Sequence, residues 1–323
     1  FTSGEFKALI RYNAMYRDSS LHMLQDGSDP LPDSEKQQQY SAFGGYFGYE
    51  TAPWFNTTFG ATVYTSQPIG NNPDDRRGLG GLYEADGGQD GYTALGELFA
   101  RWQYGGHRIT AGRQEMPAYR MVSMSNIRMT PVTHSGIAYD NTVFDDLKFS
   151  IAGINRMKER NDHTFIDMAS GARLKDFDRG KQIIRGDYNP DYFKDGVYVG
   201  PKKEMLMAGA TWQPGDFSLE AWNYYIGDFV NSLYLYGDYS ISPGEGNWSY
   251  TLAAQYTDQS DVGDRVGGDI DTWHWGLKLS AGRPGMLLFA GYNEVAYNEA
   301  SYDGGTLFVR WGTPQMFNSF QVQ

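Results

Sequence analysis

The chain has 323 residues, no cysteine, a formal net charge of −12 at pH 7 and a mean hydropathy of −0.55. The acidic balance excludes a nucleic-acid-binding protein, because phosphate recognition requires clustered lysine and arginine. The sequence contains no apolar run of about 18 residues, which excludes a helical membrane protein. Aromatic residues make up 15% of the chain, which exceeds the need of a soluble core and is typical of aromatic girdles at membrane interfaces.

The first predicted strand, residues 6–17, alternates with a period of two residues. One face carries aromatic and aliphatic side chains, namely Phe6, Ala8, Ile10, Tyr12, Ala14 and Tyr16. The opposite face is polar and includes the cations Lys7, Arg11 and Arg17. Successive side chains of a strand point to opposite faces. Strands of about ten residues that are apolar outside and polar inside are typical of transmembrane β-barrels.

Twelve further segments complete a set of thirteen predicted strands. Their ranges are 40–51, 54–66, 93–104, 107–115, 132–144, 148–158, 204–213, 217–226, 230–241, 247–257, 271–281 and 286–294. In the segment 54–66, we expect Phe59 and Ala61 to face lipid, and Thr58 and Thr62 to face the interior. In the segment 217–226 both faces carry aromatic side chains, so the sequence leaves its phase open.

Short and long links alternate between these strands. The short links contain the Gly, Pro or Asp residues that hairpin turns require, and they lie at 52–53, 105–106, 145–147, 214–216, 243–246 and 282–285. The long links lie at 18–39, 67–92, 116–131, 159–203 and 258–270, and the link near Gly227 is the one short member of this series. Long loops at one rim and short turns at the other are typical of outer-membrane barrels. We therefore predict an all-β fold, a single transmembrane antiparallel β-barrel domain over residues 1–323.

The predicted strand number is odd, whereas bacterial single-chain barrels close with an even number. Two explanations are open. Either the last strands of the barrel are missing from this sequence, or the residues 307–311 form an unusual fourteenth strand. We favour missing C-terminal strands, because the sequence lacks a terminal strand that ends in an aromatic residue.

Three segments resemble the OprD family of outer-membrane porins. They are the opening strand at 10–18, the sequence Gly-Arg-Gln-Glu-Met-Pro at 112–117 and the sequence Asn-Ile-Arg-Met-Thr-Pro at 126–131. The resemblance continues in strand order and implies an eighteen-stranded barrel for diffusion of small hydrophilic solutes, often with a carboxylate. It also implies that the loop at about 116–131 folds inward and constricts the pore.

The resemblance further implies a ladder of basic side chains along the pore. Arg11, Arg17 and Arg128 match the family by position, whereas Lys7 and Arg108 are assigned to the pore by alternation alone. Basic side chains in a pore raise the local concentration of anions, and arginine can hold a carboxylate with two hydrogen bonds. The alternative is that these cations pair with wall carboxylates such as Glu50 and Glu97.

The same loop contains four methionines, Met116, Met121, Met124 and Met129. Met116, Met124 and Met129 are our candidates for an apolar lining of the constriction, because thioethers adapt to varied apolar groups. The alternative, which we favour, is that they pack the loop against the barrel wall.

The acidic stretch 258–271 suggests two interpretations. Its carboxylates could bind Ca²⁺, but they lack the spacing of an EF-hand loop. We favour a solvated surface loop, or one that divalent ions bridge to lipid phosphates.

We predict a porin of the bacterial outer membrane, a diffusion channel in contact with membrane lipid and lipopolysaccharide. No catalytic residue, metal ion or cofactor is assigned, because none of the five histidines lies in a catalytic motif. His274 is expected in the pore wall. The alternative functions are a structural barrel whose long loops bind a surface partner, and a barrel enzyme. The sequence leaves open whether the barrel is a monomer or a homotrimer.

Overall fold

The computed structural model describes residues 4–18, 37–69, 82, 90–117, 119–122, 128–160, 162–171, 192–194, 197–244, 247–296, 298, 307–309 and 311. Most of the predicted long links at 18–39, 67–92 and 159–203 lie outside the described residues. In the described part of the chain, no helix is long and apolar enough to span a membrane.

All thirteen predicted strands are confirmed. They are β1 (Glu5–Asp18), β2 (Gln37–Glu50), β3 (Thr57–Pro68), β4 (Tyr92–Tyr104), β5 (His107–Gln114), β6 (Thr133–Asn141), β7 (Leu147–Lys158), β11 (Met205–Trp212), β12 (Phe217–Ile226), β13 (Val230–Ile241), β14 (Ser249–Asp261), β15 (Asp271–Arg283) and β16 (Met286–Val295). The remaining elements are short: β8 (Phe165–Ile166), the helix α2 (Met168–Gly171), β9 (Phe193–Lys194) and β10 (Val197–Tyr198).

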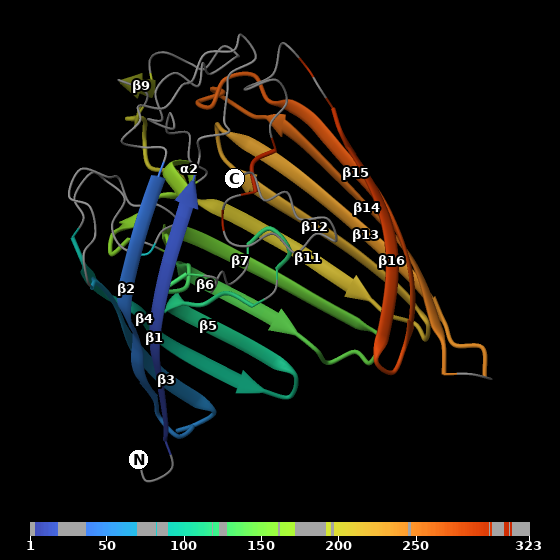
Figure 1. Cartoon of the computed structure of the whole chain (residues 1–323), viewed down its shortest axis with the longest axis horizontal. Helices are drawn as coiled ribbons and strands as arrows, with labels where there is room; N and C mark the ends of the chain where they lie inside the picture. Colours follow the sequence, from blue (N-terminus) through green and yellow to red (C-terminus); the bar gives the residue numbers. More distant parts are fainter. Residues whose placement is uncertain are drawn as a thin grey trace.

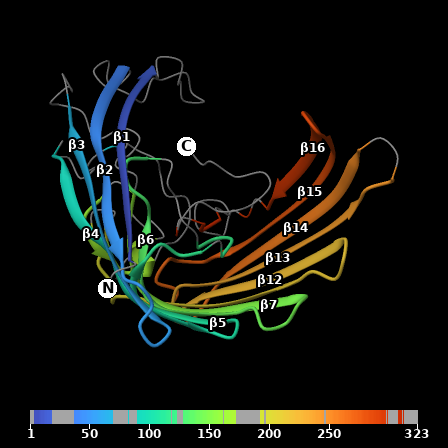
Figure 2. The same cartoon turned by 90° about the horizontal axis from the view of Figure 1, so that it is seen from below.

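The thirteen strands form one antiparallel sheet in which each strand pairs with its neighbours in the sequence, with β8 added beside β7. Figure 1 shows the strands in this order, and Figure 2 shows them curving around a common interior. In the described residues β1 and β16 are the two edges of the sheet. Because consecutive strands run in opposite directions, alternate connections lie at the same rim. This agrees with the alternation of short and long links.

The predicted two-residue alternation is confirmed by burial. On β1, Phe6, Ile10 and Tyr12 are exposed on the outside, whereas Lys7 and Arg11 are partly buried inside. The same division holds for β3, where the outer face carries Phe59, Ala61 and Val63 and the inner face carries Gly60, Thr62, Tyr64 and Ser66. The sequence left open which face of β12 points inward. In the structure the inward side chains include Ser218, Trp222 and Tyr224. The sheet therefore has an apolar outer surface and a mixed inner surface, as a membrane barrel requires.

The turn between β2 and β3 differs from the prediction. We expected a tight link at 52–53 and a strand that already contained Phe55. Instead, Phe55 and Asn56 have positive φ values of 46° and 59°, and Trp54 pairs with Thr57 across them. Positive φ at both central residues is the geometry of a type I′ hairpin, which matches the twist of the flanking strands. The strand therefore begins at Thr57.

One other predicted boundary is wrong, and the alternative of a strand at 307–311, which we did not favour, is not found in the described residues. β14 continues to Asp261, so Asp258 lies in a strand and the acidic loop begins only after it. The described residues of 307–311 do not form a strand: Phe308, Val309 and Trp311 are buried against the interior face of the sheet instead. Hydrogen bonds of this segment to Gln259 and His134 replace the strand pairing.

A charge on the outer face of β3 should destabilise the protein. Replacing Ala61 by Arg or Lys should cost about 2–4 kcal/mol, because the residue lies on the lipid face near the middle of a strand. Urea unfolding in lipid vesicles measures this cost. Asn13→Arg, on the inner face of β1, is the control and should cost less. Equal costs for both variants would contradict the assigned faces.

Candidate functional site

Charged side chains form a network on the inner face of β1 to β4. Lys7 Nζ lies 2.7 Å from Glu97 Oε2 and 3.5 Å from Glu50 Oε1. Arg101 Nη1 lies 3.3 Å from Glu50 Oε2. Thr62 Oγ1 donates to Glu97 Oε2 at 2.5 Å. The carboxylates of the wall therefore balance the charges of Lys7 and Arg101.

A register shift places Glu97 in this network. The pairing of β3 with β4 is irregular between Thr62 and Val63, where Thr62 pairs with Glu97 and Val63 with Leu95. Gly96 is the extra residue of this β-bulge, and both Leu95 and Leu98 remain on the outer face. A bulge inserts one extra residue into a strand, so the residues after it face the side opposite to the one that strict alternation would give them. Glu97 and Arg101 consequently face inward.

The network lines a polar cavity of about 310 Å³ together with Tyr46, Tyr64 and Glu115. Tyr64 donates a hydrogen bond to Glu115 Oε1 at 2.8 Å, and the Glu115 backbone N–H donates to Glu97 Oε1 at 3.3 Å. Burial raises the pKa of Glu115, although the hydrogen bond from Tyr64 opposes this shift. The cavity thus combines two cations with three carboxyl groups.

Arg108 on β5 is also paired with the wall. Its Nε and Nη2 atoms donate to Asp140 Oδ2 at 3.0 and 2.8 Å. The other oxygen of Asp140 accepts hydrogen bonds from Tyr119 at 2.7 Å and from Ser150 at 2.6 Å. Tyr119 belongs to the connection between β5 and β6, so this ion pair also fixes that connection to the wall.

Arg11 and Arg128 meet between β1 and the same connection. The Arg11 guanidinium donates to the backbone carbonyl of Arg128, and Arg128 Nη1 lies 3.5 Å from Met15 Sδ, a weak acceptor. Arg128 Nε is buried without a hydrogen-bond partner. Among the residues that the structure describes, no carboxylate forms an ion pair with Arg128. Burial lowers the pKa of Arg128, but a guanidinium stays charged at neutral pH.

Arg120 attaches the connection to the opposite wall. It donates from Nε to Glu220 Oε2 of β12 at 2.7 Å and from Nη2 to Glu220 Oε1. Its guanidinium lies 4.5 Å from the centre of the Tyr236 ring, and Trp222 Nε1 donates to Glu220 Oε2 at 3.1 Å. Although burial alone would lower the pKa of Arg120, the hydrogen bonds to Glu220 hold it above its usual value.

The connection between β5 and β6 therefore contacts two distant parts of the sheet. Near its start, Tyr224 of β12 donates to the carbonyl of Tyr119 at 2.6 Å and accepts from the N–H of Met121 at 3.2 Å. Near its end, Arg128 contacts β1. Residues 118 and 123–127 lie outside the described part. The described contacts place Tyr119, Met121 and Arg128 against the inner face of the sheet.

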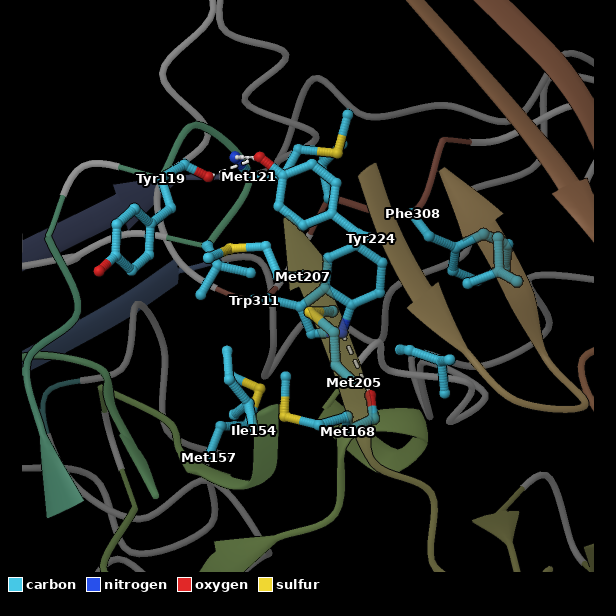
Figure 3. Packing of buried hydrophobic residues seen from close by; sticks show 14 of the residues in the cluster. Tyr119, Met121, Ile154, Met157, Met168, Met205, Met207, Tyr224, Phe308 and Trp311 are labelled. Carbon is cyan, nitrogen blue, oxygen red and sulfur yellow. Dashed lines mark hydrogen bonds between the residues drawn. The ribbon is translucent and has the colours of Figure 1, made fainter. Parts of the chain in front are cut away.

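The three methionines that we predicted to line the constriction differ in their surroundings. Met116 is buried in a large apolar cluster, whose members from β7, β11 and β12 are shown in Figure 3. Met129 is buried in a second cluster with Tyr40, Ala42 and Leu82. Met124 lies outside the described residues. The burial of Met116 and Met129 agrees with packing of the loop against the wall.

The basic residues predicted from sequence differ in their contacts. Lys7 and Arg108 are paired with wall carboxylates, whereas Arg11 and Arg128 contact each other. The side chain of Arg17 lies outside the described residues. Glu50 and Glu97, the predicted wall carboxylates, pair with Lys7 and Arg101 rather than with Arg11.

Sequence reasoning missed Arg101, Arg120 and Lys158. A glycine within a strand pattern signals a bulge, so Gly96 could have indicated that Arg101 faces inward. No feature of the sequence indicated the contact of Arg120 with the wall, because its position depends on the path of a loop. Lys158 ends β7 and is fully buried, and its ammonium donates to the carbonyls of Pro131, Glu159 and Asp162 and to the Thr130 hydroxyl.

The acidic stretch gives no support for a calcium site. Arg265 Nε lies 3.0 Å from Asp261 Oδ1, and Arg265 Nη1 lies 2.6 Å from Asp269 Oδ1. In the described ranges, no three His, Cys, Asp or Glu side chains are grouped in a way that could hold a metal ion. His274 is buried on the inner face of β15 and contacts Asn293 at 3.1 Å, the location expected for a wall residue.

Comparison with known proteins adds to this geometry. The sequence model of the outer membrane porins of the OprD family matches residues 72–322. A comparison with curated proteins gives no match.

Several solved structures share the fold. Pseudomonas aeruginosa OccK9 (OpdG) is 18% identical with a TM-score of 0.70, and the alignment covers 99% of this chain and 72% of that one. Acinetobacter baumannii OccAB3 is 16% identical with a TM-score of 0.68, covering 90% and 66%. Pseudomonas aeruginosa OpdK with vanillate is 16% identical with a TM-score of 0.64, covering 91% and 67%. This chain therefore spans about two thirds to three quarters of the length of these proteins.

The ion pair between Arg120 and Glu220 should show strong coupling. In a double-mutant cycle with alanine at each position, we expect a coupling of about 0.5–3 kcal/mol in the free energy of unfolding, because both side chains are mostly buried and bonded twice. The pair of Lys203 and Asp228, which is more exposed, is the control and should couple less. Additive effects of the Arg120 and Glu220 substitutions would show that the pair does not hold the loop.

Proposed function

The chain belongs to the OprD family of outer membrane porins, and we propose that it is a passive diffusion channel for small hydrophilic solutes that carry a carboxylate. It is a β-barrel porin of the bacterial outer membrane. We further propose that the connection at about 116–131 forms the constriction of the pore. The side chain of Arg128 is the proposed contact for the solute carboxylate.

The observation that carries this proposal is the charge environment of Arg128. Lys7, Arg101, Arg108 and Arg120 each have a carboxylate partner in the wall. Arg128 has none among the described residues, and its buried Nε lacks a hydrogen-bond partner. A buried donor without a partner is costly. A solute carboxylate could satisfy it with charge-assisted hydrogen bonds, and a low-dielectric wall would strengthen the attraction.

The contacts of the connection support its role as a constriction. It is fixed to β12 by Arg120 and to β1 through the carbonyl of Arg128. A segment anchored on two walls narrows the space between them. Vanillate, the compound named with the structure of OpdK, is an aromatic carboxylate, and this chemistry agrees with an arginine beside apolar side chains.

The environment of the barrel is part of the same proposal. The exposed apolar side chains of β1, β3 and β14 would contact lipid, and the long connections would contact lipopolysaccharide. A homotrimer remains a proposal that the size of the purified protein in detergent would test. Family and fold support a channel, and we infer that the protein has no enzymatic role.

Replacing Arg128 by Ala should lower carboxylate flux more than the flux of a neutral sugar of equal size. We expect a loss of roughly fivefold for the carboxylate, which corresponds to about 1 kcal/mol of lost attraction. The measurement uses the full chain in planar bilayers or liposomes. The difference should shrink at high salt, because mobile ions screen the fixed charge.

Arg156→Ala is the matched control, since Arg156 is exposed on β7 and should leave both fluxes unchanged. Equal losses of the two solutes in the Arg128 variant would mean that Arg128 holds the loop without selecting the solute. Unchanged fluxes would mean that it does not reach the pore.

A further inference from the structure

A buried histidine nitrogen in the barrel interior has no partner. His134 of β6 is fully buried, and its Nε2 lies 2.7 Å from the backbone carbonyl of Trp311. A carbonyl only accepts hydrogen bonds, so Nε2 carries the proton and Nδ1 carries the lone pair. Within the described residues, Nδ1 has no hydrogen-bond partner. A buried lone pair of this kind is an available ligand for a metal ion.

Buried methionines lie on the elements next to this histidine. Met157 of β7 is the cross-strand partner of His134, and like His134 it is buried. The sulfur of Met157 lies against α2, because a Cβ atom added at Gly171 would collide with it. Met168, the first residue of α2, is fully buried. The thioethers of β7 and α2 therefore occupy the same part of the interior.

Two further contacts bring Met205 and Trp311 to the same place. The N–H of Met168 donates to the carbonyl of Lys203 at 2.9 Å, two residues before the buried Met205 at the start of β11. Trp311 donates from Nε1 to the carbonyl of Met168 at 3.2 Å while it accepts from His134. Figure 3 shows Met157, Met168 and Met205 in the same cluster as Trp311.

We propose that this group is a binding site for a soft monovalent metal ion, Cu⁺. We call it the interior thioether site, and its ligands are His134, Met157, Met168 and Met205. Thioether sulfur is a soft ligand that selects Cu⁺ among the biological metal ions, and neutral imidazole binds copper well. Nothing in the porin activity requires this site, so the inference goes beyond the proposed function.

The composition of the site excludes the common divalent ions. Ca²⁺ and Mg²⁺ require oxygen ligands, chiefly carboxylates, and structural Zn²⁺ sites use cysteine, histidine or carboxylate. In the described ranges, no group of three such side chains could hold a metal ion. A monovalent ion also has a smaller desolvation cost in an uncharged apolar site than a divalent ion. Soft, uncharged ligands around one imidazole therefore favour Cu⁺.

A bound ion would connect parts of the barrel that are far apart in the sequence. His134 lies in β6, Met157 in β7 and Met205 in β11, and Met168 lies in the long connection between the last two strands. A ligand that binds the folded state alone stabilises it. Cu⁺ would therefore fix α2 and its connection against the barrel wall.

The test measures Cu⁺ binding by the full chain, purified and folded in detergent under anaerobic conditions with ascorbate. A chromogenic Cu⁺ chelator serves as the competitor. The protein should compete for a single Cu⁺ ion, and its thermal unfolding temperature should rise when Cu⁺ is added. Met157→Leu and Met168→Leu preserve volume and should each lower the affinity by about tenfold or more, the scale of loss when contacts of a metal site are removed.

Met129→Leu is the matched control, because Met129 is equally buried but belongs to the other apolar cluster. It should leave the affinity for Cu⁺ unchanged. X-ray absorption at the copper edge should show sulfur and nitrogen neighbours, with the nitrogen contribution lost in His134→Leu. The proposal is overturned if the protein does not bind Cu⁺, if the Met157 and Met168 variants bind it unchanged, or if Met129→Leu weakens it equally. Tighter binding of Zn²⁺ than of Cu⁺ would also overturn it.

Discussion

The hydrogen-bonding demand of the backbone in a membrane governs this structure. Lipid offers no partner for N–H and C=O groups, so a spanning strand must satisfy them through neighbouring strands. In the described residues, thirteen consecutive antiparallel strands meet this demand by pairing with their neighbours in the sequence, except at the outer edges of β1 and β16. The pairing register then assigns every side chain to the lipid face or the interior, because a slip by one residue would exchange the two faces.

The interior depends on a second constraint, the pairing of charge. Several described cations that face inward are balanced by carboxylates across strands or across a loop, as in the pairs of Lys7 with Glu97, Arg108 with Asp140 and Arg120 with Glu220. These pairs fix the walls and the connection after β5. Arg128, by contrast, has no carboxylate partner among the described residues, and we propose that its charge therefore sets the preference of the pore. The net charge of the whole chain is therefore a poor guide to its selectivity.

The apolar part of the interior has a different character. It consists of methionines and aromatic residues contributed by β7, β11, β12, α2, the connection after β5 and the segment 307–311 (Figure 3). Methionine side chains are flexible and fill irregular spaces between elements that run in different directions. This explains their abundance where loops pack against strands. His134 is connected to this region through the 2.7 Å contact of its Nε2 with the carbonyl of Trp311.

The sequence by itself determined the strands, their inner and outer faces and the short turns, because a period of two residues and local turn residues are properties of neighbouring positions. Phe6 and Ile10 outside and Lys7 and Arg11 inside follow from that period alone. The tertiary structure decided what depends on distant positions. The path of a loop brought Arg120 to Glu220, one hundred residues away. No local pattern records such contacts, because they exist only once the sheet has curved and the loop has folded into its interior.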